Sequence, residues 1–241
     1  MLPGPCARYT VPVIRNLTRS ACTLLLAYVS LLPGTAFAAP AQPPRPAAAP
    51  DPIVFVHGWN SDGSIWQTMA SRFRADGVPS NRLDQWTYDT AQSNTVTAAR
   101  LAEEIRRVLD RTGARRVDVV AHSMGSLSSR HYLKKFAGAA KVDAWVSLAG
   151  PNHGTTLANW CHQTSCVEMR PGSEFLSALN SGDETPGAPR YATWASPCDN
   201  TISPRDSVAL AGARNTTTDC LDHSGLHEDR KVYEQVKSHL G

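Results

Sequence analysis

Short apolar runs alternate with longer amphipathic stretches from Pro52 to the end of the chain. The apolar runs predict strands, because valine-rich runs of this length are typical of buried parallel strands; they are residues 52–56, 83–88, 115–121, 142–150 and 190–196. The amphipathic stretches predict helices at residues 63–77, 94–113, 124–138 and 228–240, with a short helix at 173–180. Alternation at this spacing predicts an α/β fold, with a mostly parallel sheet covered by helices on both faces.

The helical stretches carry their own end signals. In residues 94–113 an apolar stripe is followed by a terminal glycine, Gly113; the stripe is Val96, Leu101, Ile105, Val108 and Leu109. In residues 63–77 one face holds Ile65, Met69 and Phe73, and Gly77 marks the end. Ser173 is placed to cap the short helix. These signals make helix the expected state of all three segments.

The N-terminal part of the chain has a different composition. Three arginines precede the uncharged apolar run of residues 21–32, which is followed by the small-residue sequence Ala36-Phe37-Ala38. This order predicts a secretory signal peptide over residues 1–38, and the apolar run is shorter than the roughly 20 residues that span a bilayer. We therefore expect a secreted, extracellular protein without stable membrane insertion. Residues 39–51 are rich in proline and alanine and predict a linker, which leaves residues 52–241 as one catalytic domain.

Removal of the signal peptide changes the charge balance. The chain has 24 Lys and Arg against 21 Asp and Glu, and the first 38 residues hold three Arg and no acid, so 24 − 3 = 21 basic residues remain against 21 acidic ones. A neutral domain without a concentrated basic run is a poor partner for nucleic acid. We expect a monomer that binds no nucleic acid.

Four cysteines remain in the expected domain: Cys161, Cys166, Cys198 and Cys220. In an exported chain they predict two disulfides, for which three connectivities are possible. The alternative, a zinc site of four thiolates, lacks the usual C-x-x-C pair, so no metal is expected. Cys198 adjoins Asp199 and Cys220 comes three residues before His223, which favours a Cys198–Cys220 bridge and leaves Cys161 to pair with Cys166.

Ser123 lies in the sequence Ala121-His122-Ser123-Met124-Gly125, between a predicted strand and a predicted helix. This is the context of a nucleophile elbow, in which the flanking residues are small because strand and helix backbones approach closely. Alanine in place of the first glycine adds only one methyl group. We therefore predict that Ser123 is a catalytic nucleophile, with the backbone N–H of Met124 as one oxyanion donor.

The partners of such a serine follow it in the order acid, then histidine. Asp199 stands just past a predicted strand and is the expected acid, whereas its rivals lack a strand ahead of them: Asp183, Asp206, Asp219 and Asp222. His223 lies on the loop before the last helix and is the expected base. His227, close to the first turn of that helix, and His239, in its last turn, are the alternatives.

Residues 53–59, 113–125 and 191–240 resemble the small secreted bacterial lipases of lipase class 2. The resemblance implies a minimal α/β-hydrolase fold and a serine ester hydrolase that needs no cofactor, with Ser123, Asp199 and His223 as its triad. It also implies the backbone of Trp59 as the second oxyanion donor. Residues 151–189 are longer and richer in glycine and proline than in the smallest members, so the presence of a lid stays open.

The expected substrate is an uncharged acyl ester, and triacylglycerol is the first choice. Apolar residues near the elbow are candidates for an acyl pocket or for ordinary core packing: Trp59, Trp66, Met124, Leu157 and Trp160. Three further histidines, His57, His122 and His153, are interpreted as structural or pocket-lining. A short-chain carboxylesterase, a polyester hydrolase and a non-catalytic secreted binding protein remain as alternatives.

Overall fold

A computed structural model describes residues 49–241. The expected signal peptide and all but the last residues of the expected linker lie outside the described residues. Six parallel strands form one sheet in the order β2-β1-β3-β4-β5-β6. Their bounds are β1 Ile53–Val56, β2 Leu83–Trp86, β3 Val117–His122, β4 Val142–Leu148, β5 Arg190–Ala195 and β6 Arg214–Thr217. The predicted α/β architecture is confirmed.

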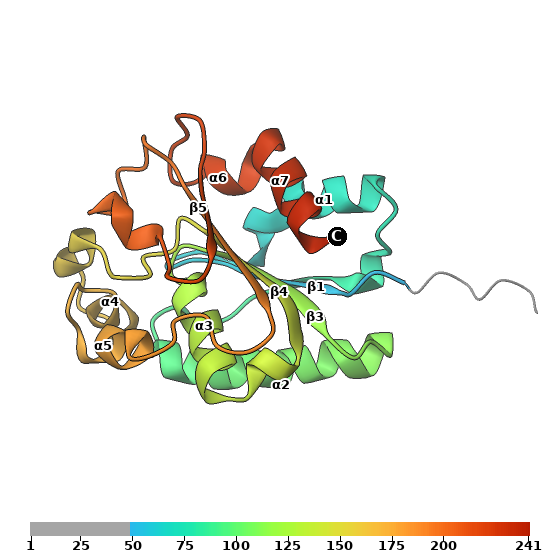
Figure 1. Cartoon of the computed structure of the whole chain (residues 1–241), viewed down its shortest axis with the longest axis horizontal. Helices are drawn as coiled ribbons and strands as arrows, with labels where there is room; N and C mark the ends of the chain where they lie inside the picture. The colour runs from blue at the N-terminus through green and yellow to red at the C-terminus, as the bar shows by residue number, and fades with distance from the viewer. Residues whose placement is uncertain (1–48) are drawn as a thin grey trace, which may run out of the picture. The chain divides into compact units, whose positions relative to one another are not determined.

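Helices cover both faces of the sheet (Figure 1). One face packs against α2 (Asn94–Thr112) and α3 (Gly125–Lys135), and the other against α1 (Gln67–Ala75) and α7 (Arg230–Leu240). Strand β1 shows the alternation that two covered faces require: Val54 and Val56 join the core beneath α2 and α3, whereas Ile53 and Phe55 join the core beneath α1 and α7. All four side chains are buried, which explains the continuous apolar run.

The predicted helices occur with shifted ends. Residues 63–77 begin as a 3-10 helix, Gly63–Trp66, whose first turn is capped by the Asp62 carboxylate, and α1 follows. Helix α2 ends at Gly113, which adopts φ +67°, and Ser173 caps α5 (Glu174–Asn180) as expected. The expectation that Val96 belongs to the buried stripe of α2 is wrong, because it points to solvent from the first turn.

Several elements were not expected from the pattern. Strand β6, with the sequence Arg-Asn-Thr-Thr, has no apolar side chain and pairs with β5 at the edge of the sheet. Helices α4 (Thr164–Glu168) and α6 (Gly225–Glu228) are too short to show a period. The remaining elements are 3-10 helices at Ser80–Arg82, Gly138–Ala140, Thr156–Trp160 and Arg205–Val208.

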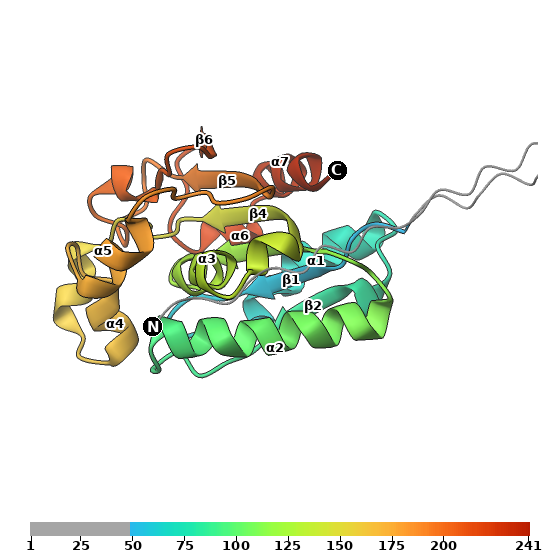
Figure 2. The same cartoon turned by 60° about the horizontal axis from the view of Figure 1, so that its bottom comes forward.

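The carboxyl ends of the parallel strands all lie at one edge of the sheet, where ligands bind in open α/β folds. The segment between β4 and β5 carries α4 and α5, which lie together at the end of the molecule where α2 begins (Figure 2). Within residues 49–241 no helix is both long enough and apolar enough to cross a membrane. The carboxyl edge of the sheet is therefore the expected place of a functional site.

Candidate active site

Ser123 lies at the tip of the turn between β3 and α3. Its backbone adopts φ +53°, a conformation that non-glycine residues rarely take and that is typical of functional sites. The neighbouring backbones approach so closely that a Cβ on Gly58 would lie 2.8 Å from the Ser123 Cβ. A Cβ on Gly125 would lie 2.5 Å from the carbonyl oxygens of Val56 and His57. Crowding of this kind is the physical reason for small residues around an elbow.

Asp199 and His223 are brought together at the same edge. The Asp199 Oδ2 atom lies 2.8 Å from the His223 Nδ1 atom, and Asp199 Oδ1 accepts hydrogen bonds from the backbone N–H groups of Thr201 and Ile202 at 2.7 and 3.3 Å. Burial alone would raise the pKa of Asp199, but the hydrogen bond and charge of His223 and the two amides outweigh it and lower the pKa below its ordinary value. Asp199 is thus an ionised, buried carboxylate that orients one imidazole.

A disulfide and the hydrogen bonds of Ser196 hold the loops that carry Asp199 and His223. A disulfide joins Cys198 to Cys220, with a Cα–Cα distance of 5.0 Å, and a second disulfide joins Cys161 to Cys166. The Ser196 hydroxyl donates to the carbonyl oxygen of Leu221 at 2.5 Å and accepts from the Leu221 N–H at 2.9 Å. Ser196 was not singled out from the sequence, because a serine at a strand end carries no distinguishing signal.

The rival histidines have other surroundings. The His122 ring lies 4.6 Å from the His223 ring and 4.9 Å from the His227 ring, measured between centroids. Burial lowers the pKa of His227 and holds that of His122 well below its ordinary value. The His239 Nε2 atom lies 3.1 Å from the backbone carbonyl oxygen of Arg190, at the beginning of β5 and so at the opposite end of that strand from Asp199. Among these histidines, the carboxylate of Asp199 contacts His223.

His57 and His153 form hydrogen bonds with groups other than Asp199. The N–H of Tyr88 donates to His57 Nε2 at 3.3 Å, so the remaining proton is on His57 Nδ1, which donates to the Gly58 carbonyl at 2.9 Å. Burial lowers the pKa of His57. His153 Nε2 lies 2.8 Å from Glu184, on a half-exposed side chain. His57 therefore braces the turn after β1, and His153 braces the segment that contains Glu184.

The rival acids are likewise occupied or remote. Asp183 accepts the N–H of Thr185, Asp219 pairs with Lys231, and Asp222 accepts the N–H of Gly225. Asp206 is exposed on a 3-10 helix. Of the five acids considered from the sequence, the carboxylate of Asp199 is the one bonded to a histidine ring in the described part of the chain.

A cavity of about 290 Å³ opens beside Ser123 and His223. Its other walls are largely apolar and include both cysteines of the second disulfide: Trp59, Thr155, Leu157, Ala158, Trp160, Cys161, Cys166, Met169, Thr201 and Ile202. Three of the five candidate pocket residues therefore line it, whereas the side chains of Trp66 and Met124 are fully buried in the core. Thr155 was missed; its hydroxyl donates to the Thr201 carbonyl at 2.6 Å and joins the pocket wall to the Asp199 loop.

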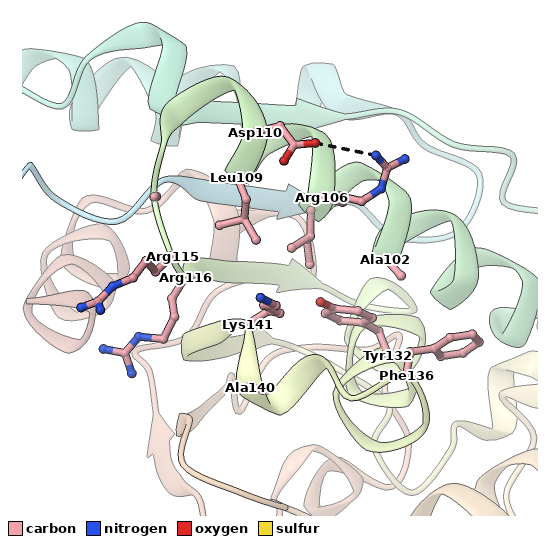
Figure 3. Close-up of a pocket in the computed structure, with 12 residues that line it drawn as sticks. Ala102, Arg106, Leu109, Asp110, Arg115, Arg116, Tyr132, Phe136, Ala140 and Lys141 are labelled. Atoms are coloured by element: carbon pink, nitrogen blue, oxygen red, sulfur yellow. Dashed lines mark ion pairs between the residues drawn. The ribbon is translucent and has the colours of Figure 1, made fainter.

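A larger hollow of about 820 Å³ lies between α2 and α3, away from the elbow (Figure 3). Apolar side chains such as Ile105 and Tyr132 form part of its lining, and Arg106, Arg115 and Lys141 stand at its margin. It contains none of the predicted site residues. Over residues 49–241, no group of three or more His, Cys, Asp or Glu side chains is arranged to hold a metal ion.

Comparison with known proteins identifies a family that this sequence matches. The family described as Lipase (class 2) matches residues 50–239. A triacylglycerol lipase of Pseudomonas fragi is 33% identical over 92 residues, which are 38% of this chain and 30% of the relative, so the chain matches less than a third of that relative's length.

Solved lipase structures share the fold. The mature form of the Bacillus licheniformis lipase BlEst2 superimposes with a TM-score of 0.70 at 20% identity, over 83% of this chain and 96% of that chain. Aspergillus fumigatus lipase B gives a TM-score of 0.66 at 16% identity, over 76% of this chain and 51% of that chain. The predicted α/β-hydrolase fold is confirmed. Because the family match covers most of the sequence, this chain belongs to the class 2 lipase family.

Proposed function

We propose that the protein is a serine carboxylic ester hydrolase of the lipase type, with Ser123, His223 and Asp199 as its catalytic triad. The observation that carries the proposal is the 2.8 Å contact between Asp199 and His223, whose ring lines the same cavity as Ser123. With Nδ1 of His223 directed at the carboxylate, Nε2 is the nitrogen left to exchange a proton with the serine. Membership of the lipase family supports the same reaction.

In this mechanism Ser123 Oγ attacks the ester carbonyl carbon while His223 takes the serine proton. The tetrahedral intermediate collapses, the carbon–oxygen bond to the alcohol breaks, and His223 returns the proton to the leaving alcohol. A water molecule, deprotonated by His223, then attacks the acyl-enzyme and releases the carboxylic acid and free Ser123. Asp199 keeps the ring in the productive tautomer and stabilises the imidazolium formed in both steps.

The developing oxyanion requires N–H donors fixed before the reaction begins. We assign this role to the backbone N–H groups of Met124 and Trp59. Met124 follows the nucleophile directly, and Trp59 follows Gly58, whose backbone lies against Ser123. The Trp59 indole N–H donates to Gln163 Oε1 at 2.6 Å, which ties the Trp59 loop to the disulfide loop 161–166.

Triacylglycerol is the proposed substrate, because the cavity walls are apolar and the curated relative is named for that activity. Short-chain carboxylesters and polyesters are the second choices, since the same triad would cleave them. The protein is proposed to act outside the cell as a monomer, needing no cofactor. Two disulfides support an oxidising location.

The test uses a fluorophosphonate probe, which reacts with activated serines, and a series of neutral esters. Wild-type protein is expected to be labelled once and to hydrolyse acyl esters with kcat/KM rising from acetyl to medium chains, since each buried CH₂ contributes about 0.8 kcal/mol. Ser123→Ala should lose both labelling and hydrolysis. Unlabelled wild-type protein would leave the non-catalytic alternative, and a maximum at acetyl would favour a short-chain esterase.

A further inference from the structure

The Trp59 loop, residues 57–62, joins β1 to the first 3-10 helix and belongs to no helix or strand. Trp59 is 39% exposed, and the next residue, Asn60, is exposed and adopts φ +52°, which non-glycine residues rarely take. Within residues 49–241 the backbone N–H of Trp59 donates to no other group, which leaves it free for an oxyanion. A donor on an exposed loop is fixed before the reaction only if other segments hold the loop.

Two hydrogen bonds connect the Trp59 loop to the disulfide loop, residues 161–166. In the first, the Trp59 indole N–H donates to Gln163 Oε1 at 2.6 Å. The second runs through Thr90, whose hydroxyl oxygen accepts the Asn60 N–H at 3.1 Å and whose carbonyl oxygen accepts the Ser165 hydroxyl at 2.6 Å. Both connections therefore end on the same short segment.

The disulfide loop is itself held at both ends. A covalent bond joins Cys161 to Cys166 around Gln163, with a Cα–Cα distance of 5.9 Å. At the end of α4, Glu168 accepts the Asn94 N–H at 2.6 Å, which fastens this helix to the start of α2 (Figure 2). The Gln163 side chain is exposed, and a long exposed side chain samples many rotamers unless its surroundings are fixed. The disulfide thus restricts where the Gln163 amide can lie.

Gln163 has no direct place in the active-site cavity. Among the described residues, those that line this cavity include Trp59 but not Gln163. Any influence of Gln163 on the reaction must therefore pass through Trp59.

We propose that Gln163 is a positioning residue that holds Trp59, and with it one backbone oxyanion donor, and that the Cys161–Cys166 disulfide holds Gln163 in turn. The inference rests on the proposed function, which takes the Trp59 N–H as an oxyanion donor. Full negative charge develops on the carbonyl oxygen only as the tetrahedral intermediate forms. Displacement of the donor therefore lowers kcat and leaves KM nearly unchanged.

The test begins with Gln163→Ala, which removes the acceptor of the indole N–H. On a dissolved short-chain ester it should lower kcat ~10-fold and change KM less than about 2-fold, since complete loss of an oxyanion donor lowers kcat ~10²- to 10³-fold. An alkyl trifluoromethyl ketone, whose adduct with Ser123 carries an oxyanion, should bind more weakly by a similar factor. Gln163→Glu keeps an acceptor for the indole and should restore most of the kcat.

Gln235→Ala is the matched control. Gln235 Oε1 also accepts an indole N–H, that of Trp194, at 2.7 Å, but Gln235 lies on α7 and contacts no part of the Trp59 loop. This variant should keep the wild-type kcat. All variants are compared as folded protein at the same temperature.

A double-mutant cycle measures the part played by the disulfide. The combined change Cys161→Ser and Cys166→Ser should lower kcat on the same ester. Adding Gln163→Ala should then lower it less than about 2-fold further, because both changes remove the same contact. Fully additive losses would overturn the role given to the disulfide.

Three results would overturn the positioning role of Gln163: wild-type kcat in Gln163→Ala, a loss confined to KM, or equal losses in Gln163→Glu and Gln163→Ala. An equal loss of kcat in Gln235→Ala would also overturn it, since the effect would then be one of general destabilisation. The proposed function is judged separately. Activity retained by Ser123→Ala would remove the triad, whereas an inactive Ser123→Ala beside an unaffected Gln163→Ala would overturn this inference alone.

Discussion

The His122 Nε2 atom lies 3.0 Å from the backbone carbonyl oxygen of His223. A carbonyl oxygen only accepts hydrogen bonds, so His122 Nε2 carries the proton and donates it. Burial is the main cause that holds the pKa of His122 well below its ordinary value, and the neighbouring His223 and His227 lower it further. This ring is therefore neutral at neutral pH. The residue just before Ser123 thus fixes the backbone of the loop that carries the proposed base.

Replacing His122 with phenylalanine should therefore weaken catalysis without touching the substrate. The His223 carbonyl is partly buried, and leaving such a group unpaired costs about 1–3 kcal/mol. We therefore expect kcat to fall ~10-fold while KM changes less than about 2-fold. His122→Gln, whose amide N–H can reach the same carbonyl, should recover most of the kcat. The measurement is steady-state kinetics on a dissolved ester. Equal kcat for both variants, or a loss confined to KM, would exclude the positioning role.

The assignment of the base is tested by comparing neighbouring histidines. His223→Ala should lower kcat by at least ~10³-fold, and Asp199→Asn should also lower it greatly because the wrong tautomer is then favoured. His227→Ala is the matched control, since that ring is buried nearby but has no contact with Asp199. The measurement is the kcat of each variant, taken on protein that is shown to be folded. A larger loss for His227→Ala than for His223→Ala would reverse the assignment.

The two disulfides should differ in their effects on stability. The cysteines of the Cys198–Cys220 bridge are 22 positions apart in sequence and those of Cys161–Cys166 only five, and loop-closure entropy then gives about 3 and about 2 kcal/mol. The double variant Cys198→Ser with Cys220→Ser should also lose activity on dissolved esters, because it frees the loops of Asp199 and His223. Urea unfolding and kcat are the measurements. Unchanged activity after loss of the longer bridge would show that the hydrogen bonds of Ser196 and His122 hold those loops without it.

The long helices could be predicted because their side chains alternate between buried and exposed faces over many residues. The central strands could be predicted because both of their faces are buried, which produces continuous apolar runs. Neither pattern could predict β6, whose polar sequence is tolerated only because β5 offers it a free edge. Val96 was misplaced because it lies five residues before Leu101, which is about 140° around the helix, whereas the buried positions of the first turn are Asn94, Thr97 and Ala98.

The residues of the candidate site also differ in how far the sequence can predict them. Ser123 has a local signal, because the elbow constrains residues next to it in sequence. Asp199 and His223 could be ranked only by their positions after a strand and before a helix. Thr155 and Ser196 join segments 46 and 25 residues away, at Thr201 and Leu221 respectively, and no local pattern records a contact over that separation.

Asp118 offers a test of buried charge away from the site. Burial, with Asp51 and Asp143 nearby, raises its pKa to about 7, so its carboxyl group is protonated in the fold at pH 5 and largely ionised at pH 8. A raised pKa means that the folded state loses stability as pH rises from about 4 to 7. Asp118→Asn keeps the acceptor for the Ala144 N–H and should stabilise the protein by about 1–3 kcal/mol more at pH 8 than at pH 5. Urea unfolding at both pH values measures this; destabilisation at pH 8 would contradict it.

The two small residues of the elbow, Gly125 and Ala121, should differ in how much their exchange costs. In Gly125→Ala the new Cβ would meet two backbone carbonyl oxygens of β1 and its following turn at 2.5 Å, and a backbone inside a sheet cannot move aside. We expect a loss of at least about 3 kcal/mol in the free energy of unfolding and a large drop in kcat, because any relief displaces Ser123. Ala121→Gly instead removes one buried methyl group from β3 and should cost about 1 kcal/mol with kcat retained. Unfolding curves and ester kinetics of both variants provide the test. If Gly125→Ala were as stable and active as Ala121→Gly, close approach of backbones could not be the reason that this turn requires glycine after the serine.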